Sequence, residues 1–175
     1  MIRFFDIFFS LAGLIILSPI LILIMIIGLI ENGSPLFKQE RLGQNKKIFF
    51  LIKYRSMLKS TKSVPTHLVN VSMITPFGMI LRRTKLDELP QLFNVLKGDM
   101  SLVGPRPCLS NQKYLIDERD KRGVFNVKPG ITGLAQVSNI NMEKPLLLAQ
   151  IDLKMINNMS LYYYFYYILK TFFRK

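Results

Sequence analysis

The sequence predicts a mainly helical protein with a little β-structure, in which a membrane-embedded N-terminal segment precedes a small α/β unit and an interfacial, amphipathic C-terminal helix. Three observations support this class. The stretch from Ile7 to Ile30 contains no charged residue, apolar residues recur at helical spacing from Phe77 to Leu96, and aromatic residues crowd positions 161–173. The chain has 175 residues and 50% of them are hydrophobic, which is enough for one domain with its own core.

The N-terminal apolar stretch, Ile7 to Ile30, is longer than the roughly 20 residues that a helix needs to cross a bilayer. A cleaved signal peptide is the alternative, although no small-x-small cleavage pattern follows the stretch. Ser18 and Pro19 lie at its middle and predict a kink, because proline removes a backbone donor and the serine hydroxyl can satisfy a freed carbonyl. The residues alone favour a kinked spanning helix over a re-entrant hairpin that enters and leaves one leaflet. In both cases the flanking cations place residues 32 onward in the cytoplasm.

The middle of the chain alternates between short regular elements and loops. The apolar, partly β-branched stretch from Ile48 to Tyr54 predicts either a short strand or an amphipathic helix, and the polar region from Lys59 to Pro76 predicts a loop. In the helical stretch that follows, Pro90 indicates that one helix ends near Lys85 and another begins around Asp87. Asp87 is therefore expected at a helix N-terminus, where free backbone N–H groups and the helix dipole favour negative charge.

The C-terminal residues from Leu161 to Lys175 combine tyrosine and phenylalanine with terminal cations, a composition suited to the headgroup boundary of a membrane. A helix that buries its aromatic side chains in the core is the alternative, and the segment is too short to cross a bilayer. These features divide the chain into a membrane segment over residues 1–31, a cytoplasmic unit over residues 32–156 and an interfacial segment over residues 157–175.

Charge limits the classes of partner. The formal net charge of +13 calls for an anionic partner, which could be nucleic acid, an acidic membrane surface or a phosphorylated substrate. A single cysteine, Cys108, excludes a disulfide within this sequence, and a single histidine, His67, leaves no Cys/His cluster for zinc. A metal ion is therefore expected to be a hard, oxygen-bound cation such as Mg²⁺.

An adjacent acidic pair, Asp87 and Glu88, lies among the cations Arg82, Arg83 and, later in the chain, Arg106. Such a dipeptide commonly caps or solvates a helix, but its basic surroundings here point to a site for a metal ion and phosphates. Adjacent helical residues diverge by about 100°, so the two carboxylates are expected to have separate roles.

The Pro-Arg-Pro element at residues 105–107 is a second indication of chemistry. Its two prolines restrict their own backbone and that of the residues before them, so Arg106 is presented on a stiff, extended segment. A guanidinium held in this way can bind a phosphate with two parallel hydrogen bonds. A rigid connector with an exposed arginine is the alternative. The turn from Lys128 to Gly133, with two glycines, could in addition let the backbone approach a ligand.

The combination of these motifs resembles the bacterial sugar transferases, the monotopic phosphoglycosyl transferases that move a sugar 1-phosphate from a nucleotide diphosphate sugar to polyprenyl phosphate. The resemblance extends over nearly the whole chain, and the size is similar to the minimal, catalytic-core form of the family. The residues that carry it are Ser18 and Pro19 together with the segments 39–43, 53–57, 81–92, 98–107 and 128–137.

The resemblance implies a role for each motif. Asp87 matches the family's nucleophile, which attacks the sugar-bearing phosphorus, expels UMP and holds the sugar as an acyl phosphate. Glu88 matches its partner, which is assigned to the Mg²⁺ site that both carboxylates form or to assisting the acceptor phosphate. Arg106 is expected to contact phosphate. Ser18 and Pro19 match the break that makes the membrane segment re-entrant, which reverses the preference for a spanning helix.

Further site residues follow from the same segments. The residues expected to bind substrate phosphate besides Arg106 are Arg82, Arg83, Lys53 and Arg55. Asp152 matches a late acidic position of the family, and Gln136 lies in a shared segment; both are candidate site residues without an assigned role.

The implied partners are a UDP-sugar, polyprenyl (undecaprenyl) phosphate and the cytoplasmic leaflet of the bacterial inner membrane, with Mg²⁺ as cofactor and no nucleic acid; a homodimer is left open. Such a transferase performs the first membrane step in exopolysaccharide, lipopolysaccharide or glycoprotein biosynthesis. Many relatives have a Gly-Arg-Asn stretch where this chain has residues 138–145, so an arginine that could touch the nucleotide sugar is missing. The identity of the sugar therefore stays open, and an N-acetylated or deoxy sugar is expected.

Two other functions fit part of the sequence. A membrane-anchored basic protein that binds anionic lipid or nucleic acid would account for the charge and the anchor, but not for the acidic pair or the Pro-Arg-Pro element. A glycosyltransferase that moves the bare sugar would release UDP instead of UMP.

Overall fold

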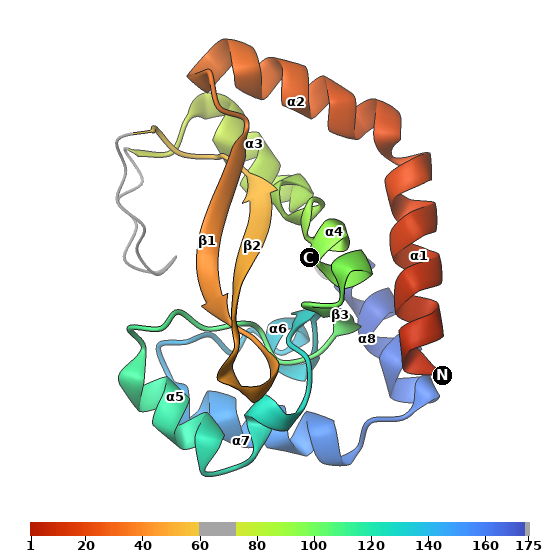
Figure 1. Cartoon of the computed structure of the whole chain (residues 1–175), viewed down its shortest axis with the longest axis vertical. Helices are drawn as coiled ribbons and strands as arrows, with labels where there is room; N and C mark the ends of the chain where they lie inside the picture. The colour runs from red at the N-terminus through yellow and green to blue at the C-terminus, as the bar shows by residue number, and fades with distance from the viewer. Residues whose placement is uncertain (60–72, 174–175) are drawn as a thin grey trace.

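The computed structural model of the protein describes residues 1–59 and 73–173. In these residues helices dominate, and short strands form two separate two-stranded sheets, which confirms the predicted class of mainly α-structure with a little β-structure. Two N-terminal helices form a bent arm along one side of the molecule, and a long β-hairpin lies across from this arm (Figure 1). The remaining helices lie between and below them (Figure 1).

The bent arm consists of α1 (Ile2–Ile16) and α2 (Ser18–Asn32), whose axes meet at 64°. The predicted break is confirmed: Pro19 lies in the first turn of α2, and the hydroxyl of Ser18 donates a 2.8 Å hydrogen bond to the carbonyl oxygen of Ile15. Within the described residues, neither helix alone is long and apolar enough for a membrane crossing, whereas the bent pair together meets the length and composition criteria.

A β-hairpin follows the arm. Strand β1 (Leu36–Leu42) pairs antiparallel with β2 (Ile48–Tyr54), and Leu36 faces Tyr54 across the ladder. Of the two structures predicted for the second stretch, the strand is therefore correct. Side chains alternate along it, since Phe49 and Leu51 are buried while Ile48 and Phe50 are exposed, as the period of two in a strand requires.

The predicted pair of helices after the hairpin exists, but its second member begins later than expected. Helix α3 (Pro76–Thr84) ends at Lys85, and α4 (Gln91–Lys97) begins after Pro90; a 3-10 turn, η4 (Leu86–Glu88), lies between them. Pro90 takes the position directly before the helix, so Asp87 lies in the connecting turn and not at an α-helix N-terminus. The loop predicted from Lys59 to Pro76 falls mostly on residues 60–72, outside the described residues, and Pro76 itself begins α3.

The C-terminal half forms the lower part of the molecule (Figure 1). Strands β3 and β4 pair as a short parallel sheet. The backbones approach so closely beside this sheet that a Cβ on Gly130 would lie 1.9 Å from the backbone nitrogen of Gly104, so this position requires glycine. The glycine in this turn thus allows two backbone segments to pack against each other. The elements of this half are β3 (Ser101–Val103), α5 (Lys113–Asp120), η5 (Val124–Asn126), β4 (Gly130–Thr132), α6 (Leu134–Val137), α7 (Pro145–Asn157) and α8 (Leu161–Phe172).

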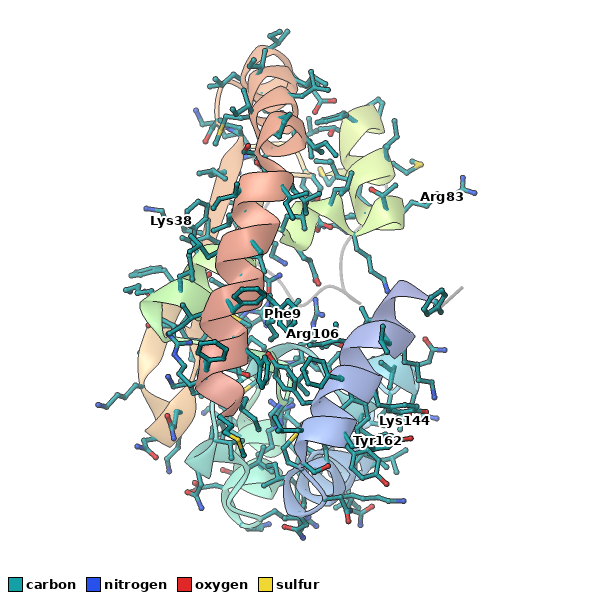
Figure 2. All side chains as sticks on the ribbon, turned by 90° about the vertical axis from the view of Figure 1, so that its right-hand side faces the viewer. Phe9, Lys38, Arg83, Arg106, Lys144 and Tyr162 are labelled. Carbon is teal, nitrogen blue, oxygen red and sulfur yellow. The ribbon has the colours of Figure 1, made fainter. Side chains whose placement is uncertain are left out.

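The aromatic helix α8 confirms the core alternative for one of its faces, and its place at a membrane boundary stays a prediction. Tyr164 and Tyr167 are buried in a core cluster with Val103 and Met155, whereas Tyr162 is exposed and points away from the helix toward the outside (Figure 2). One face of the helix therefore belongs to the core, and the other presents aromatic rings to the surroundings.

A buried carboxylate ties the arm to the rest of the molecule. Asp6 of α1 accepts hydrogen bonds of 2.9 Å from the hydroxyl of Ser101, the backbone N–H of Leu102 and the hydroxyl of Tyr164. Three donors from β3 and α8 thus compensate the desolvation of this carboxylate. The arm is consequently fixed to the strand that leads into the Pro-Arg-Pro element.

Candidate active site

The acidic pair lies in the turn η4, between the end of α3 and the start of α4. Thr75 caps α3 by accepting a hydrogen bond from the backbone N–H of Gly78, and Lys85 ends the helix in a left-handed conformation with φ of 59°. A Cβ on Gly78 would lie 2.1 Å from the carbonyl oxygen of Ser56, so only glycine lets α3 approach the end of the hairpin this closely. The turn therefore lies against β2.

Glu88 forms the closest ion pair of the site. Its Oε1 atom lies 2.5 Å from Nη2 of Arg106, which extends from the loop after β3. Burial alone would raise the pKa of the Glu88 carboxyl, but the charges of Arg106 and Lys53 outweigh it and lower this pKa. The pair brings together the acidic pair and the Pro-Arg-Pro arginine, which are separated in the sequence.

Asp87 lies beside this pair in a different environment. Its exposed fraction is 8%, and burial followed by repulsion from Glu88 raises the pKa of the Asp87 carboxyl to about 6. The cations Lys53, Arg82 and Arg106 oppose this rise. The two carboxylates therefore differ, as expected for separate roles.

Two of the four additional cations predicted to bind phosphate lie near the acidic pair. Lys53 sits near the end of β2, where burial and repulsion from Arg106 lower the pKa of its ammonium group to about 8. Arg82 donates from Nε to the hydroxyl of Ser56 at 2.8 Å, and its charge opposes the rise in the pKa of Asp87. Both residues contribute positive potential at the site.

The other two cations are placed differently. Arg55 donates to the carbonyl oxygens of Ser34 and Leu36 and covers the ring of Phe37, so its contacts lie at the start of β1. Arg83 is exposed on α3 and points away from the molecule (Figure 2). The structure thus does not bring these two arginines together with the acidic pair, and their phosphate contacts stay predictions.

The structure connects Asp152 and Gln136 with the Pro-Arg-Pro loop and the residue before it. Gln136 donates from Nε2 to the carbonyl oxygen of Gly104 at 3.3 Å. Oδ2 of Asp152 accepts from Nε and Nη2 of Arg119 at 3.0 and 2.7 Å, and Arg119 in turn donates to the carbonyl oxygen of Arg106.

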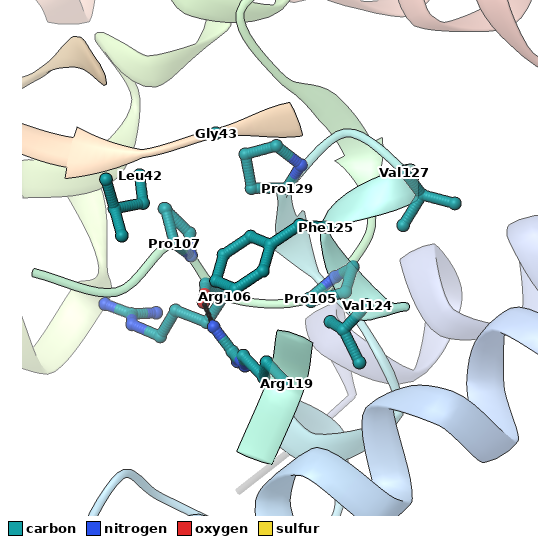
Figure 3. Close-up of a pocket in the computed structure, with 10 residues that line it drawn as sticks. All are labelled: Leu42, Gly43, Pro105, Arg106, Pro107, Arg119, Val124, Phe125, Val127 and Pro129. Atoms are coloured by element: carbon teal, nitrogen blue, oxygen red, sulfur yellow. Dashed lines mark hydrogen bonds between the residues drawn. The ribbon is translucent and has the colours of Figure 1, made fainter. Parts of the chain in front are cut away.

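Sequence reasoning missed Arg119 and the role of Arg41, which donates to the carbonyl oxygen of Pro107. Arg119 belongs to a charged run that has the composition of a solvated helix face, so no local signal marks it as buried. Arg41 lies in the segment 39–43 that carries the resemblance, and this was its only signal. Behind the loop, a small pocket is lined by Pro105, Phe125 and the backbone of Arg106, whose side chain extends away from it (Figure 3).

The carboxylate oxygens of the site fit Mg²⁺ only if substrate phosphates and water complete its coordination. Asp87 and Glu88 supply carboxylate oxygens, and no cluster of three or more His, Cys, Asp or Glu side chains occurs among the residues that the structure describes. Mg²⁺ is commonly bound by one or two carboxylates plus substrate phosphates and water. Two carboxylates beside the cations Lys53, Arg82 and Arg106 match this pattern.

Known proteins of one family resemble this chain over its whole length. The family described as "Bacterial sugar transferase" matches residues 1–175. The chain is 40% identical over 157 residues to the undecaprenyl-phosphate galactose phosphotransferase of Salmonella typhimurium, covering 79% of this chain and 33% of that protein. It is 42% identical over 149 residues to an exopolysaccharide production protein of Rhizobium leguminosarum, covering 79% and 74%. With the UDP-galactose-lipid carrier transferase of Erwinia amylovora it shares 35% identity over 158 residues, covering 79% and 32%.

The chain thus spans about a third of the length of two of these relatives and about three quarters of the third. The match to the family, in contrast, extends from the first residue of the chain to the last, and it includes the turn, the loop and the bent arm described above. This protein belongs to the bacterial sugar transferase family.

Proposed function

We propose that the protein transfers a sugar 1-phosphate from a UDP-sugar to polyprenyl phosphate at the cytoplasmic face of the inner membrane, and that it releases UMP. The observation that carries this proposal is the arrangement of Asp87, a buried carboxylate with a raised pKa, beside the ion pair of Glu88 and Arg106. The names of two relatives, a galactose phosphotransferase and a lipid carrier transferase, support the same class of reaction.

The proposed reaction consists of two displacements at one phosphorus atom. A carboxylate oxygen of Asp87 attacks the sugar-bearing phosphorus, the bond from this phosphorus to the bridging oxygen breaks, and UMP leaves with the electron pair. The sugar phosphate is then held on Asp87 as an acyl phosphate. A phosphate oxygen of polyprenyl phosphate attacks the same phosphorus, and the carboxylate of Asp87 is regenerated. The first displacement balances in charge without a proton transfer.

The cations of the site have a direct role in this chemistry. A carboxylate that approaches a diphosphate is repelled by it, and a fixed positive potential from Arg106, Lys53 and Arg82 offsets this repulsion without reorganisation. Asp87 and Glu88 would hold Mg²⁺ together with phosphate oxygens. When bound, this ion supplies further neutralisation of phosphate charge.

The bent arm suits an acceptor that stays in the membrane. Apolar side chains are exposed along α1 and α2, and α8 adds further exposed rings. We expect the arm to enter and leave the cytoplasmic leaflet, with Ser18 and Pro19 at its turn, so that the phosphate of the acceptor meets the site at the interface. The exposed apolar side chains on these three helices include Phe4, Phe8, Leu11, Ile15, Ile22, Leu23, Ile26, Ile30, Tyr162 and Leu169.

An assay of nucleotide release tests the proposal. Purified protein is supplied with polyprenyl phosphate, Mg²⁺ and a panel of UDP-sugars that starts with UDP-galactose, since relatives bear this sugar in their names. UMP release is the expected result. Release of UDP would show transfer of the bare sugar, and binding of anionic lipid without nucleotide release would favour the membrane-anchored binding protein. Full activity after Mg²⁺ is removed would exclude the ion from the mechanism.

A further inference from the structure

Two buried guanidinium groups hold the backbone of the Pro-Arg-Pro loop. Nη1 of Arg119 donates to the carbonyl oxygen of Arg106 at 2.8 Å, a contact drawn as a dashed line in Figure 3. Nη1 of Arg41 donates to the next carbonyl oxygen, that of Pro107, at 2.9 Å. The donors come from α5 and β1, which lie far apart in the sequence. Two consecutive carbonyls are therefore fixed by charge-assisted hydrogen bonds, the stronger kind.

Each guanidinium is itself oriented by a partner. Arg119 binds Oδ2 of Asp152 through Nε and Nη2, and the side chains of this pair are 2% and 0% exposed. Arg41 donates from Nη2 to Oε1 of Gln39 at 2.6 Å. An ion pair buried this completely has a desolvation cost that commonly cancels its attraction, so it is weak support for stability alone. The contact of Arg119 with the Pro-Arg-Pro loop suggests that the Arg119–Asp152 pair positions this loop.

The loop has little backbone freedom left once these bonds are made. Pro105 and Pro107 fix their own φ angles, and Pro107 also restricts Arg106 to an extended conformation. The two held carbonyls then fix the orientation of the peptide planes that follow Arg106 and Pro107. Only the side-chain torsions of Arg106 remain free, and these direct its guanidinium toward Glu88.

We propose that Arg119 and Asp152 are a positioning pair for the transfer reaction, with Arg41 as a second support, and that they hold the Arg106 carbonyl so that its guanidinium meets the substrate diphosphate. This inference rests on the function proposed above. Arg119 and Asp152 touch no reacting atom; they act through Arg106.

A variant that removes both charges separates positioning from stability. Arg119→Met combined with Asp152→Ala leaves no orphaned buried charge, so it should fold, with a Tm lowered only by the lost bond to the Arg106 carbonyl and by the space left at Asp152. We expect its kcat/KM for UMP release to fall about 10²-fold, the scale of a small misplacement of a group in an active site. Glu118→Leu with Arg122→Met is the matched control, because this ion pair starts on the same helix and the hydrogen bonds of Arg122 to the part of the chain that the structure describes go to Glu118. The control should keep wild-type kinetics.

The effect of Arg106→Ala on kcat/KM, compared between the wild type and the Arg119/Asp152 variant, distinguishes positioning from a purely structural role. Arg106→Ala should cost much less kcat/KM in the Arg119/Asp152 variant than in the wild type, because the arginine is already misplaced there. Equal costs in the two backgrounds would overturn the proposal. If the double variant fails to fold, Arg41→Met gives the same test, since it removes one support without leaving a carboxylate unpaired.

Binding of UDP, measured by calorimetry in the presence of Mg²⁺, tests the inference independently of turnover. The dissociation constant should rise about 10-fold in the Arg119/Asp152 variant and stay unchanged in the Glu118/Arg122 control. Equal affinities in variant and wild type would overturn the positioning role. Absence of UMP release from the wild type would instead overturn the proposed function, and the two failures are therefore distinguishable.

Discussion

At the scale of single residues, the ionised Asp87 carboxylate is expected to lower the stability of the folded protein and to be required for turnover. Its raised pKa means that the folded state binds the proton more tightly than the unfolded state does, so the stability of the protein falls as pH rises from about 4 to about 6 and is constant above. Asp87→Asn should therefore raise the free energy of unfolding at pH 7 by up to roughly 3 kcal/mol. The same variant should lower turnover by at least about 10³-fold.

Thermal unfolding and the UMP assay, run on the same preparation, check both parts of this prediction. The expected outcome is a Tm several degrees higher together with lost activity. Near-normal turnover in Asp87→Asn would show that another group is the nucleophile.

The pH dependence of kcat/KM should be bell-shaped. The rising limb lies near pH 6, where Asp87 loses its proton and becomes nucleophilic, and the falling limb lies near pH 8, where Lys53 loses its charge. Lys53→Arg should keep activity and remove the falling limb, because arginine stays protonated at these pH values. An unchanged falling limb in this variant would assign it to another group.

Arg106 tests whether charge or geometry matters in the loop. Its guanidinium is planar and held on a fixed backbone, and it binds Glu88. Arg106→Lys keeps the charge but loses the planar fork, so its kcat/KM should resemble that of Arg106→Ala more than that of the wild type. Recovery of wild-type kinetics with lysine would show that charge alone is sufficient.

At the scale of elements, the break between α1 and α2 determines the path of the arm. Pro19 interrupts the helix, and the Ser18 hydroxyl compensates for part of the loss by its bond to Ile15. Replacing both residues with leucine should restore a continuous helix that is long enough to span. A cysteine at position 2 should react only from the cytoplasmic side in the native sequence and from the periplasm in the replacement. Periplasmic labelling of the native protein would identify a single-pass topology.

Sequence reasoning succeeded where short motifs carry the structure and failed where distant segments meet. The helix break follows from a local pattern, since proline acts on its immediate neighbours. Local motifs also single out the acidic pair and Arg106, and the structure places Glu88 beside Arg106 while their roles stay predictions. The start of α4 was misplaced because Pro90 fits both inside a first turn and just before a helix. Arg119 could not be predicted, because its burial depends on the meeting of α5 and α7.

At the scale of the whole molecule, Asp6 is one of the residues that join the arm to the body. Asp6→Leu would leave buried donors from Ser101, Leu102 and Tyr164 without an acceptor, and each unsatisfied donor costs about 1–3 kcal/mol. We expect a large decrease in Tm, measured in detergent. Tyr164→Phe removes a single hydrogen bond and should cost only about 1 kcal/mol. Equal Tm values for Asp6→Leu and the wild type would show that the arm is held by other contacts.

The contacts of α1 have a geometric consequence for an enzyme at an interface. Asp6 holds β3 just before the Arg106 loop, and Arg3 holds the carbonyls of Val95 and Leu96 at the end of α4, the helix that follows the acidic pair. Both sides of the site are thus anchored to one rigid rod. If that helix lies in a leaflet as proposed, the fold sets the distance of the nucleophile from the hydrocarbon region. The phosphate of a lipid acceptor then reacts only when it lies at that same distance from the hydrocarbon.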